Sequence, residues 1–149
     1  HCGLISPFFF LDPAGNLECV GKTNADLPIT DCAGFYDRIV IYGNNFTEIP
    51  ALSFPGMETD TLLINSNYEL LSISPKFWDG SERLVTSFDL NGNTKLKYSL
   101  IQFKGYNSKF KFFDGVQFRK YFISLPAFYL IIWLMESPKN FEKTSILKI

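Results

Sequence analysis

Three cysteines offer the first chemistry in this 149-residue chain, and all of them, Cys2, Cys19 and Cys32, lie near its N-terminal end. No two form a Cys-x-x-Cys pair, and the only histidine is His1, so the ligand spacing of a zinc site is missing. Oxidation is the remaining chemistry, and the cluster predicts a short disulfide-stapled cap in an oxidising, extracellular compartment. An odd count leaves one thiol unpaired or bonded to another chain.

Catalytic chemistry has little support among the other side chains. With His1 as the sole histidine, no Ser–His–Asp or Cys–His arrangement is available within the fold. Glu58, Glu69 and Asp79 could in principle supply a carboxylate pair, but solvated surface acids are the simpler interpretation. No Gly-rich phosphate-binding motif follows a predicted strand. We therefore expect a protein that is not an enzyme and that needs no metal and no cofactor.

The net charge and the first residues of the chain limit the classes of partner that we expect. The formal net charge is −1 and basic residues form no run, so no overall field draws the chain to nucleic acid. The chain opens at His1 rather than Met, without a charged and then apolar leader, as a processed mature chain or a fragment does. Together with the cysteines, this favours a secreted protein without a nucleic-acid partner.

A single N-glycosylation sequon, Asn45-Phe46-Thr47, is also present. In a secreted chain Asn45 is a glycan acceptor. Two points oppose its use: Phe46 is expected to pack inward, and one sequon in a chain of this length is common by chance.

The sequence contains three copies of one residue pattern, and this repeat predicts the strands and turns of the fold. Each copy has alternating apolar residues, an asparagine and a closing phenylalanine. The asparagines are 23 (67 − 44) and 26 (93 − 67) residues apart, a period typical of stacked solenoid coils. Hairpin turns would explain Asn91-Gly92 locally, but not the recurring phenylalanines. The copies are Tyr36, Ile39, Ile41, Asn44, Phe46, Ile49, Pro50, Phe54 and Met57; Leu62, Ile64, Asn67, Leu70, Ile73 and Phe77; and Phe88, Leu90, Asn93, Leu96 and Phe103.

Each copy predicts a short strand followed by a turn. The period-2 alternation at Ile39-Val40-Ile41 directs the two isoleucines inward, and the amide of the following asparagine can satisfy open backbone groups at the bend. The residues between the inward ones then face outward and form columns across the stacked strands. We expect this face to bind a protein ligand. The columns are Arg38–Thr61–Ser87, Val40–Leu63–Asp89 and Tyr42–Asn65–Asn91.

The stretch IVIYGNNFTEIPALSFPGM resembles, almost position by position, the extracellular leucine-rich repeat consensus LxLxxNxLxxIPxxxFxxL. Leu17-Glu18-Cys19-Val20-Gly21, followed by Leu27-Pro28, resembles the cysteine-bearing N-terminal cap of that family. The resemblance implies an α/β-type solenoid with short parallel strands on a concave face and mostly irregular convex segments. It also implies a secreted, protein-binding module that uses its concave sheet face.

A narrower resemblance, to secreted arthropod proteins described as the non-catalytic subunit of a luciferase, implies an alternative function as accessory subunit of an extracellular oxidative enzyme. The family's cap usually carries a Cys-x-Cys pair, where this chain has Phe8 and Phe10. The cap is therefore expected to hold a single disulfide, and the sequence is compatible with either Cys2–Cys19 or Cys19–Cys32 as the pair.

The domain organisation follows from the extent of the repeats. We predict an N-terminal cap at residues 1–34, three repeats at 35–106, and a degenerate repeat with an uncertain C-terminal segment at 107–149. In that last copy Phe110 and Phe112 take the inward positions, and Gly115 replaces the asparagine.

An apolar stretch, Tyr121–Met135, follows the repeats. It is shorter than the ~18 residues of a membrane span and contains a proline, so a buried terminal strand is favoured over an anchor. An anchor would instead indicate an ectodomain fragment of a membrane receptor. The tail beyond it is interpreted either as a divergent cap or as a truncated end.

Overall fold

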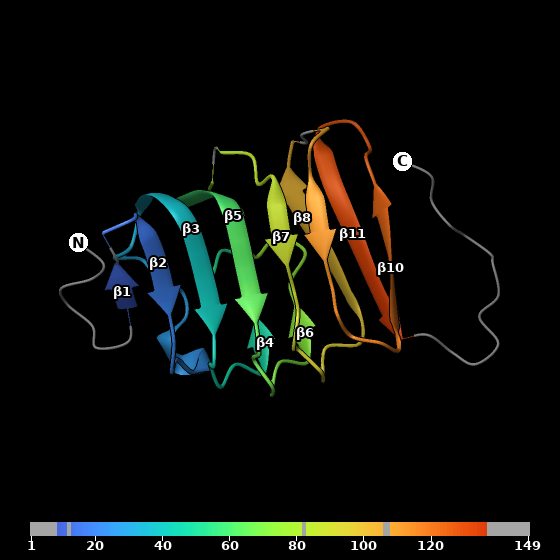
Figure 1. Ribbon diagram of the computed structural model, residues 1–149, viewed down its shortest axis with the longest axis horizontal. Coiled ribbons are helices and arrows are strands. Elements are labelled where there is room, and N and C mark those ends of the chain that lie inside the picture. Colours follow the sequence, from blue (N-terminus) through green and yellow to red (C-terminus); the bar gives the residue numbers. More distant parts are fainter. Residues whose placement is uncertain (1–8, 12, 82, 106–107, 137–149) are drawn as a thin grey trace.

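The computed structural model describes residues 9–11, 13–81, 83–105 and 108–136 as a solenoid of short β-strands (Figure 1). Its main sheet has six strands in the order β1-β2-β3-β5-β7-β9. All neighbours in it pair in parallel except β1, which is antiparallel to β2. The strands are β1 Phe9–Leu11, β2 Asn16–Cys19, β3 Gly34–Tyr42, β4 Glu48–Ile49, β5 Met57–Asn65, β6 Ser72–Ile73, β7 Ser87–Asp89, β8 Ser99–Lys104, β9 Lys111–Phe113, β10 Arg119–Ser124 and β11 Tyr129–Glu136.

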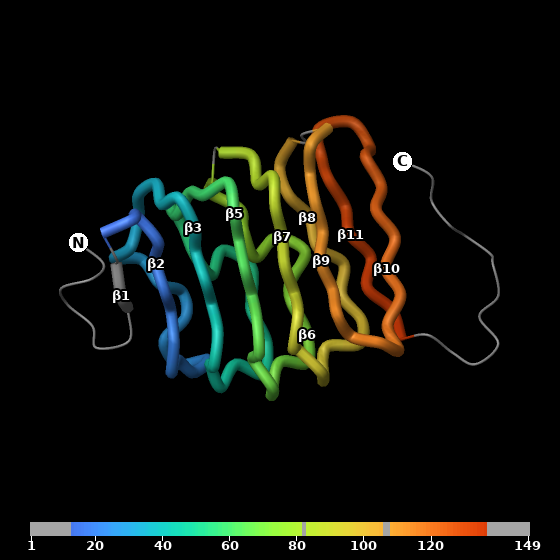
Figure 2. Tube along the Cα trace, in the orientation of Figure 1, coloured from blue at the N-terminus to red at the C-terminus, as the bar shows by residue number. Residues whose placement is uncertain are grey.

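The return segments lie behind the main sheet (Figure 2). They hold the parallel pair β4–β6 and a three-stranded sheet ordered β10-β11-β8. Among the residues described, the only helical element is the 3-10 turn η1, Asn24–Asp26, so the α/β label expected for the solenoid is wrong. The physical reason lies in the chain between β4 and β5, where Pro50, Pro55 and Gly56 leave no uninterrupted stretch for an α-helix.

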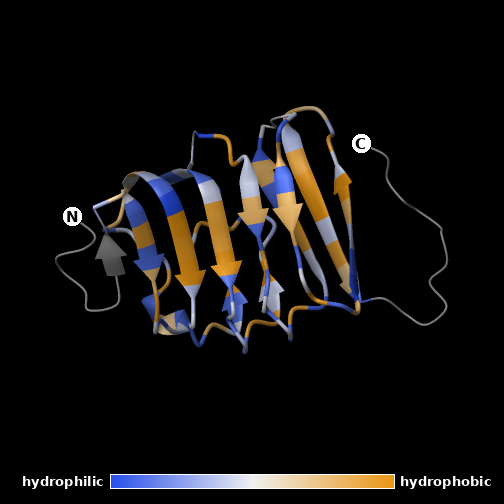
Figure 3. Ribbon diagram, viewed as in Figure 1, coloured by the Kyte–Doolittle hydropathy of each residue, from blue (hydrophilic) through white to orange (hydrophobic). Residues whose placement is uncertain are grey.

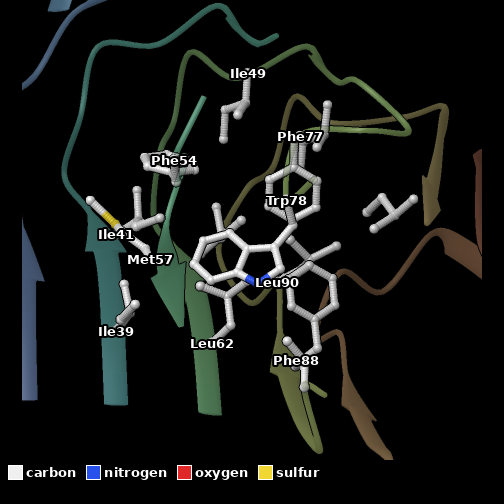
Figure 4. Close-up of a cluster of buried hydrophobic side chains, with 14 of the residues drawn as sticks. Ile39, Ile41, Ile49, Phe54, Met57, Leu62, Phe77, Trp78, Phe88 and Leu90 are labelled. Carbon is white, nitrogen blue, oxygen red and sulfur yellow. The ribbon is translucent and has the colours of Figure 1, made fainter. Parts of the chain in front are cut away.

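The core lies between the main sheet and the return segments, and the alternating apolar residues fill it as the sequence predicted. Ile39, Leu62 and Phe88 are paired across the sheet and fully or almost fully buried. Phe77 from a return segment packs on Phe88, with ring centroids 6.3 Å apart. Figure 4 shows the buried indole of Trp78 at the centre of this cluster.

A ladder of buried asparagines joins the coils, as the spacing predicted. The backbone N–H of Asn44 donates to Asn67 Oδ1 at 3.1 Å, and that of Asn67 donates to Asn93 Oδ1 at 2.9 Å. Each side-chain amide also donates to a carbonyl of the preceding strand; for Asn67 the acceptor is Ile41 O, at 3.0 Å. The side-chain amides thereby form hydrogen bonds with buried backbone N–H and C=O groups at the bends.

The cap and the repeats share one sheet. β2 pairs with β3 in parallel from Asn16↔Arg38 to Cys19↔Ile41. The backbone N–H of Lys22 donates to Asn44 Oδ1 at 2.8 Å, so the first rung of the ladder is made by the cap. The predicted cap, residues 1–34, therefore continues the sheet of the repeats through β2.

The fourth copy forms a strand but does not continue the ladder. β9 pairs with β7, and Phe112 lies opposite Phe88, with ring centroids 5.7 Å apart. Gly115, which the sequence aligned with the ladder asparagines, instead lies beside the outward Asn91, since a Cβ added to it would come 2.6 Å from Asn91 Oδ1. The expected ladder position of Gly115 is thus wrong, because the strand register differs there from the repeat spacing.

The apolar stretch Tyr121–Met135 contributes to the antiparallel strands β10 and β11, and β11 inserts between β10 and β8. Its inward residues Leu130, Ile132 and Leu134 are buried, which confirms the prediction of a buried strand. Among the described residues, no helix is long and apolar enough to cross a membrane.

Candidate protein-binding face

The strand pairing places the outward residues in the columns that the sequence predicted. Arg38, Thr61 and Ser87 pair in one row across β3, β5 and β7, and Val40, Leu63 and Asp89 pair in the next. Tyr42 pairs with Asn65, while Asn91 follows the end of β7. Arg38 is exposed and the others are half-buried. We call this surface the sheet face; it consists of Arg38, Val40, Tyr42, Thr61, Leu63, Asn65, Ser87, Asp89 and Asn91.

The sheet face has an apolar middle and a polar surround. Val40 and Leu63 pair on adjacent strands, and Figure 3 shows the apolar residues of β3 and β5 in this part of the sheet. Asp89 continues the row of this pair on β7, and Arg38 and the amides of Asn65 and Asn91 lie in the rows on either side. An apolar centre with a polar rim is the usual composition of a protein–protein contact surface.

Hydrogen bonds hold several polar groups of the sheet face in place. The hydroxyl of Tyr42 donates to Glu18 Oε2 at 3.3 Å. Desolvation raises the pKa of Tyr42, and the charge and hydrogen bond of Glu18 raise it further, so the phenol stays protonated as a donor at neutral pH. On the other side, the backbone N–H of Asn91 donates to Asp89 Oδ1 at 2.7 Å. Fixed polar groups lose less conformational entropy when a partner binds.

The rows of outward residues continue onto β2 and β9, two strands that the predicted surface did not include. Asn16 and Glu18 of β2 pair with Arg38 and Val40, and Lys111 of β9 pairs with Ser87. The alternation Leu17-Glu18-Cys19 carried the signal for β2, because it directs Glu18 outward between two inward residues.

An exposed ion pair between β5 and the connection that leads into β7 was not predicted. Arg83 Nε and NH2 donate to the two carboxylate oxygens of Asp60 at 2.7 and 3.2 Å. The guanidinium also lies 4.1 Å from the ring centroid of Phe35. The hydrogen bond to Asp60 is the main cause that raises the pKa of Arg83. No spacing in the sequence indicated this contact, because the partners come from different coils.

The predicted disulfide role of Cys19 is wrong. Cys19 is a free thiol, and it is buried at an inward position of β2, where it packs in the core. Neither pairing considered for it, with Cys2 or with Cys32, therefore forms, and no disulfide joins two of the residues described. Burial raises the pKa of Cys19 to about 12, so the group is a neutral thiol. Cys2 lies outside the described residues; Cys32 is buried, and its carbonyl accepts a hydrogen bond from Tyr36 at 2.9 Å.

The sequon lies at the turn after β3. Asn45 is exposed, and its backbone N–H donates to Lys22 O at 2.8 Å. Phe46 is fully buried, as expected, and the hydroxyl of Thr47 donates to Asn24 Oδ1 at 3.0 Å. The acceptor amide is thus accessible while the residues on either side of it are held in place.

The acids considered for catalysis lie on separate segments. Glu58 is on β5, Glu69 forms an exposed ion pair with Lys95 at 2.7 Å, and Asp79 lies between β6 and β7. Across the residues described, no group of three His, Cys, Asp or Glu side chains could hold a metal ion. His1 lies outside them.

Comparison with known proteins finds no match: no family model, no curated protein and no solved structure matches this chain.

Proposed function

We propose that this chain is a secreted leucine-rich repeat protein that binds a protein ligand through the sheet face. The observation that carries the proposal is the in-register stacking of the outward columns on β3, β5 and β7. Stacked coils present such a surface without interruption, and repeat proteins use it for extended ligands. The asparagine ladder supports the leucine-rich repeat assignment, because a buried amide recurs at the same bend of each coil.

The composition of the surface supports a protein ligand rather than a small molecule. Val40 and Leu63 form an apolar centre, and Arg38 and Tyr42 belong to the residue types that most often dominate binding energy at interfaces. Tyr42 is already oriented by Glu18. A flat array of this kind offers area instead of an enclosing cavity, which suits a partner of comparable size.

The test compares two matched surface variants by capture from the extracellular fluid of the source organism. In the first, Arg38→Ala and Leu63→Ser alter the sheet face. In the second, Lys95→Ala and Tyr68→Ser alter exposed residues that follow the ladder turns. We expect the first variant to lose the partner that the unmodified chain captures, with a fall of at least tenfold in affinity, and the second to retain it.

Equal recovery by both variants would refute binding through the sheet face. Equilibrium unfolding of each variant shows whether it is folded. Arg38, Tyr68 and Lys95 are exposed, so their substitution should change stability by less than ~1 kcal/mol, and that of the half-buried Leu63 should cost ~1–2 kcal/mol. Recovery of the chain from the secreted fraction, with its start determined by mass spectrometry, tests the compartment independently.

A further inference from the structure

A pocket of about 390 Å³ lies away from the sheet face, where return segments lead back toward the main sheet. Its size falls at the lower end of the range for small-molecule sites, ~300–1,000 Å³. The lining comes from the turn between β4 and β5, the connection from β6 to β7, the end of β8 and the start of β11. The lining residues are Leu52, Asp79, Gly80, Ser81, Lys104 and Tyr129.

The polar lining offers both hydrogen-bond donors and acceptors. The carboxylate of Asp79 accepts and the ammonium of Lys104 donates. The hydroxyl of Tyr129 can do either, and that of Ser81, which donates to Arg83 O at 3.5 Å, can accept. The formal charges of Asp79 and Lys104 cancel. A neutral ligand with several hydroxyl groups matches such a lining, because each of its hydroxyls can also donate and accept.

An apolar rim adjoins these polar groups. Leu52 and Tyr129, which line the pocket, are 52% and 45% exposed, and Phe128, which precedes Tyr129 in the chain but does not itself line the pocket, is 82% exposed. Side chains this apolar are usually covered, and where several gather beside a polar pocket they mark a contact surface. Flat aromatic rings next to paired donors and acceptors suit the C–H faces and hydroxyl edges of a sugar ring.

The backbone at the rim is held in an unfavourable conformation. Leu52 and Phe128 have φ values of 54° and 73°, in the left-handed region that favours glycine. Phe128 is the third residue of a turn closed by a hydrogen bond from Tyr129 N to Pro126 O at 3.1 Å. Glycine is the usual residue at this position of such a turn, whereas Phe128 is an exposed aromatic residue. Retained strain of this kind is typical of ligand-clamping positions.

We propose that this pocket binds a small neutral saccharide, with Tyr129 and Phe128 against the sugar ring and Asp79, Ser81 and Lys104 on its hydroxyls. The proposal is independent of the protein-binding function, because no residue of the sheet face lines the pocket.

The test is an NMR titration of the full chain with three neutral disaccharides: cellobiose, chitobiose and maltose. We expect at least one of them to shift, in a saturable way, the amide signals of residues 52, 79–81, 104–105 and 128–130. Tyr129→Leu and Asp79→Ala should each weaken that binding at least tenfold. Tyr98→Leu is the matched control, since Tyr98 is an exposed tyrosine beside β8 that does not line the pocket.

A further variant separates a ligand role from a structural one. Phe128→Gly relieves the left-handed conformation, so the midpoint of unfolding should not fall, while affinity should fall at least threefold. Unchanged affinity in this variant would overturn the assignment. Failure of all three sugars to bind, or stronger binding of the zwitterion glycylglycine, would overturn it as well.

Discussion

The guanidinium of Arg119 donates a hydrogen bond to the backbone carbonyl of Asn93 at 3.2 Å, and this contact closes the last rung of the asparagine ladder. NH1 of Arg119 also donates to the carbonyl of Leu96. Nε and NH2 of Arg119 pair with the buried carboxylate of Asp114 at 2.8 and 2.6 Å. The side-chain amide of Asn93 donates to Ile64 O of the preceding strand and also to Leu90 O of its own coil, the latter at 2.9 Å. The asparagine ladder, in which side-chain amides bond from coil to coil, therefore ends at the Asp114–Arg119 ion pair.

We predict that the Asp114–Arg119 pair matters far more for stability than its exposed counterpart. Side chains of Asp114 and Arg119 are only 1% and 2% exposed, so Arg119→Leu leaves a buried carboxylate without its cationic partner, bonded to the backbone N–H of Val116, and should lower the free energy of unfolding by ~3–5 kcal/mol. Arg83→Leu removes an exposed pair and should cost ~1 kcal/mol or less. Urea unfolding of both variants measures the difference, and similar losses would contradict it.

We predict that the amide of Asn67 cannot be replaced by an isosteric carboxylate. Asn67 donates to Ile41 O and accepts from Asn44, so Asn67→Asp loses the donor and buries a charge beside a carbonyl. The free energy of unfolding should fall by at least ~2 kcal/mol at pH 7. Asn45→Asp, at an exposed asparagine on the turn after β3, is the control and should change it by less than ~1 kcal/mol. Equal effects of the two substitutions would count against the ladder.

We predict that Trp78→Phe is nearly neutral. Among the residues described, Trp78 Nε1 is buried without a hydrogen-bond partner. The substitution removes that unsatisfied donor, which offsets the smaller buried volume, so stability should change by no more than ~1 kcal/mol. Phe88→Ala, at a neighbouring position with no polar atom to lose, should cost ~3–5 kcal/mol. A loss well above ~1 kcal/mol in the Trp78 variant would contradict this prediction.

We predict that Cys19 reacts with iodoacetamide only through unfolding. Its pKa is raised from 9.0 to about 12 by burial, so the folded chain holds the neutral thiol at pH 8, and labelling should follow the unfolding equilibrium in urea. The raised pKa also means that the stability contributed by the neutral thiol is present below pH 9.0 and is lost as pH rises toward 12. Mass spectrometry measures the labelling, and the Cys19→Ser variant gives the background from the other cysteines. Rapid labelling of Cys19 without urea would refute its burial in the core.

The sequence determined the repeating part of the molecule. Alternation with a period of two fixes which side chains face inward, and a constant position of asparagine within each coil fixes the register of neighbouring coils. These two local rules sufficed to place Arg38 beside Thr61 and Val40 beside Leu63. Repetition made long-range neighbours predictable, because each coil contacts the next in the same way.

Only the tertiary structure decided what happens where repetition stops. The insertion of β11 between β8 and β10, the contact of Arg119 with Asn93, and the meeting of Asp79, Lys104 and Tyr129 join segments that share no periodic relation. The alternation Leu17-Glu18-Cys19 directs Cys19 inward, but only the tertiary structure showed that its thiol is free. Local spacing carries no information about such contacts, since they depend on which distant segments the packed core brings together.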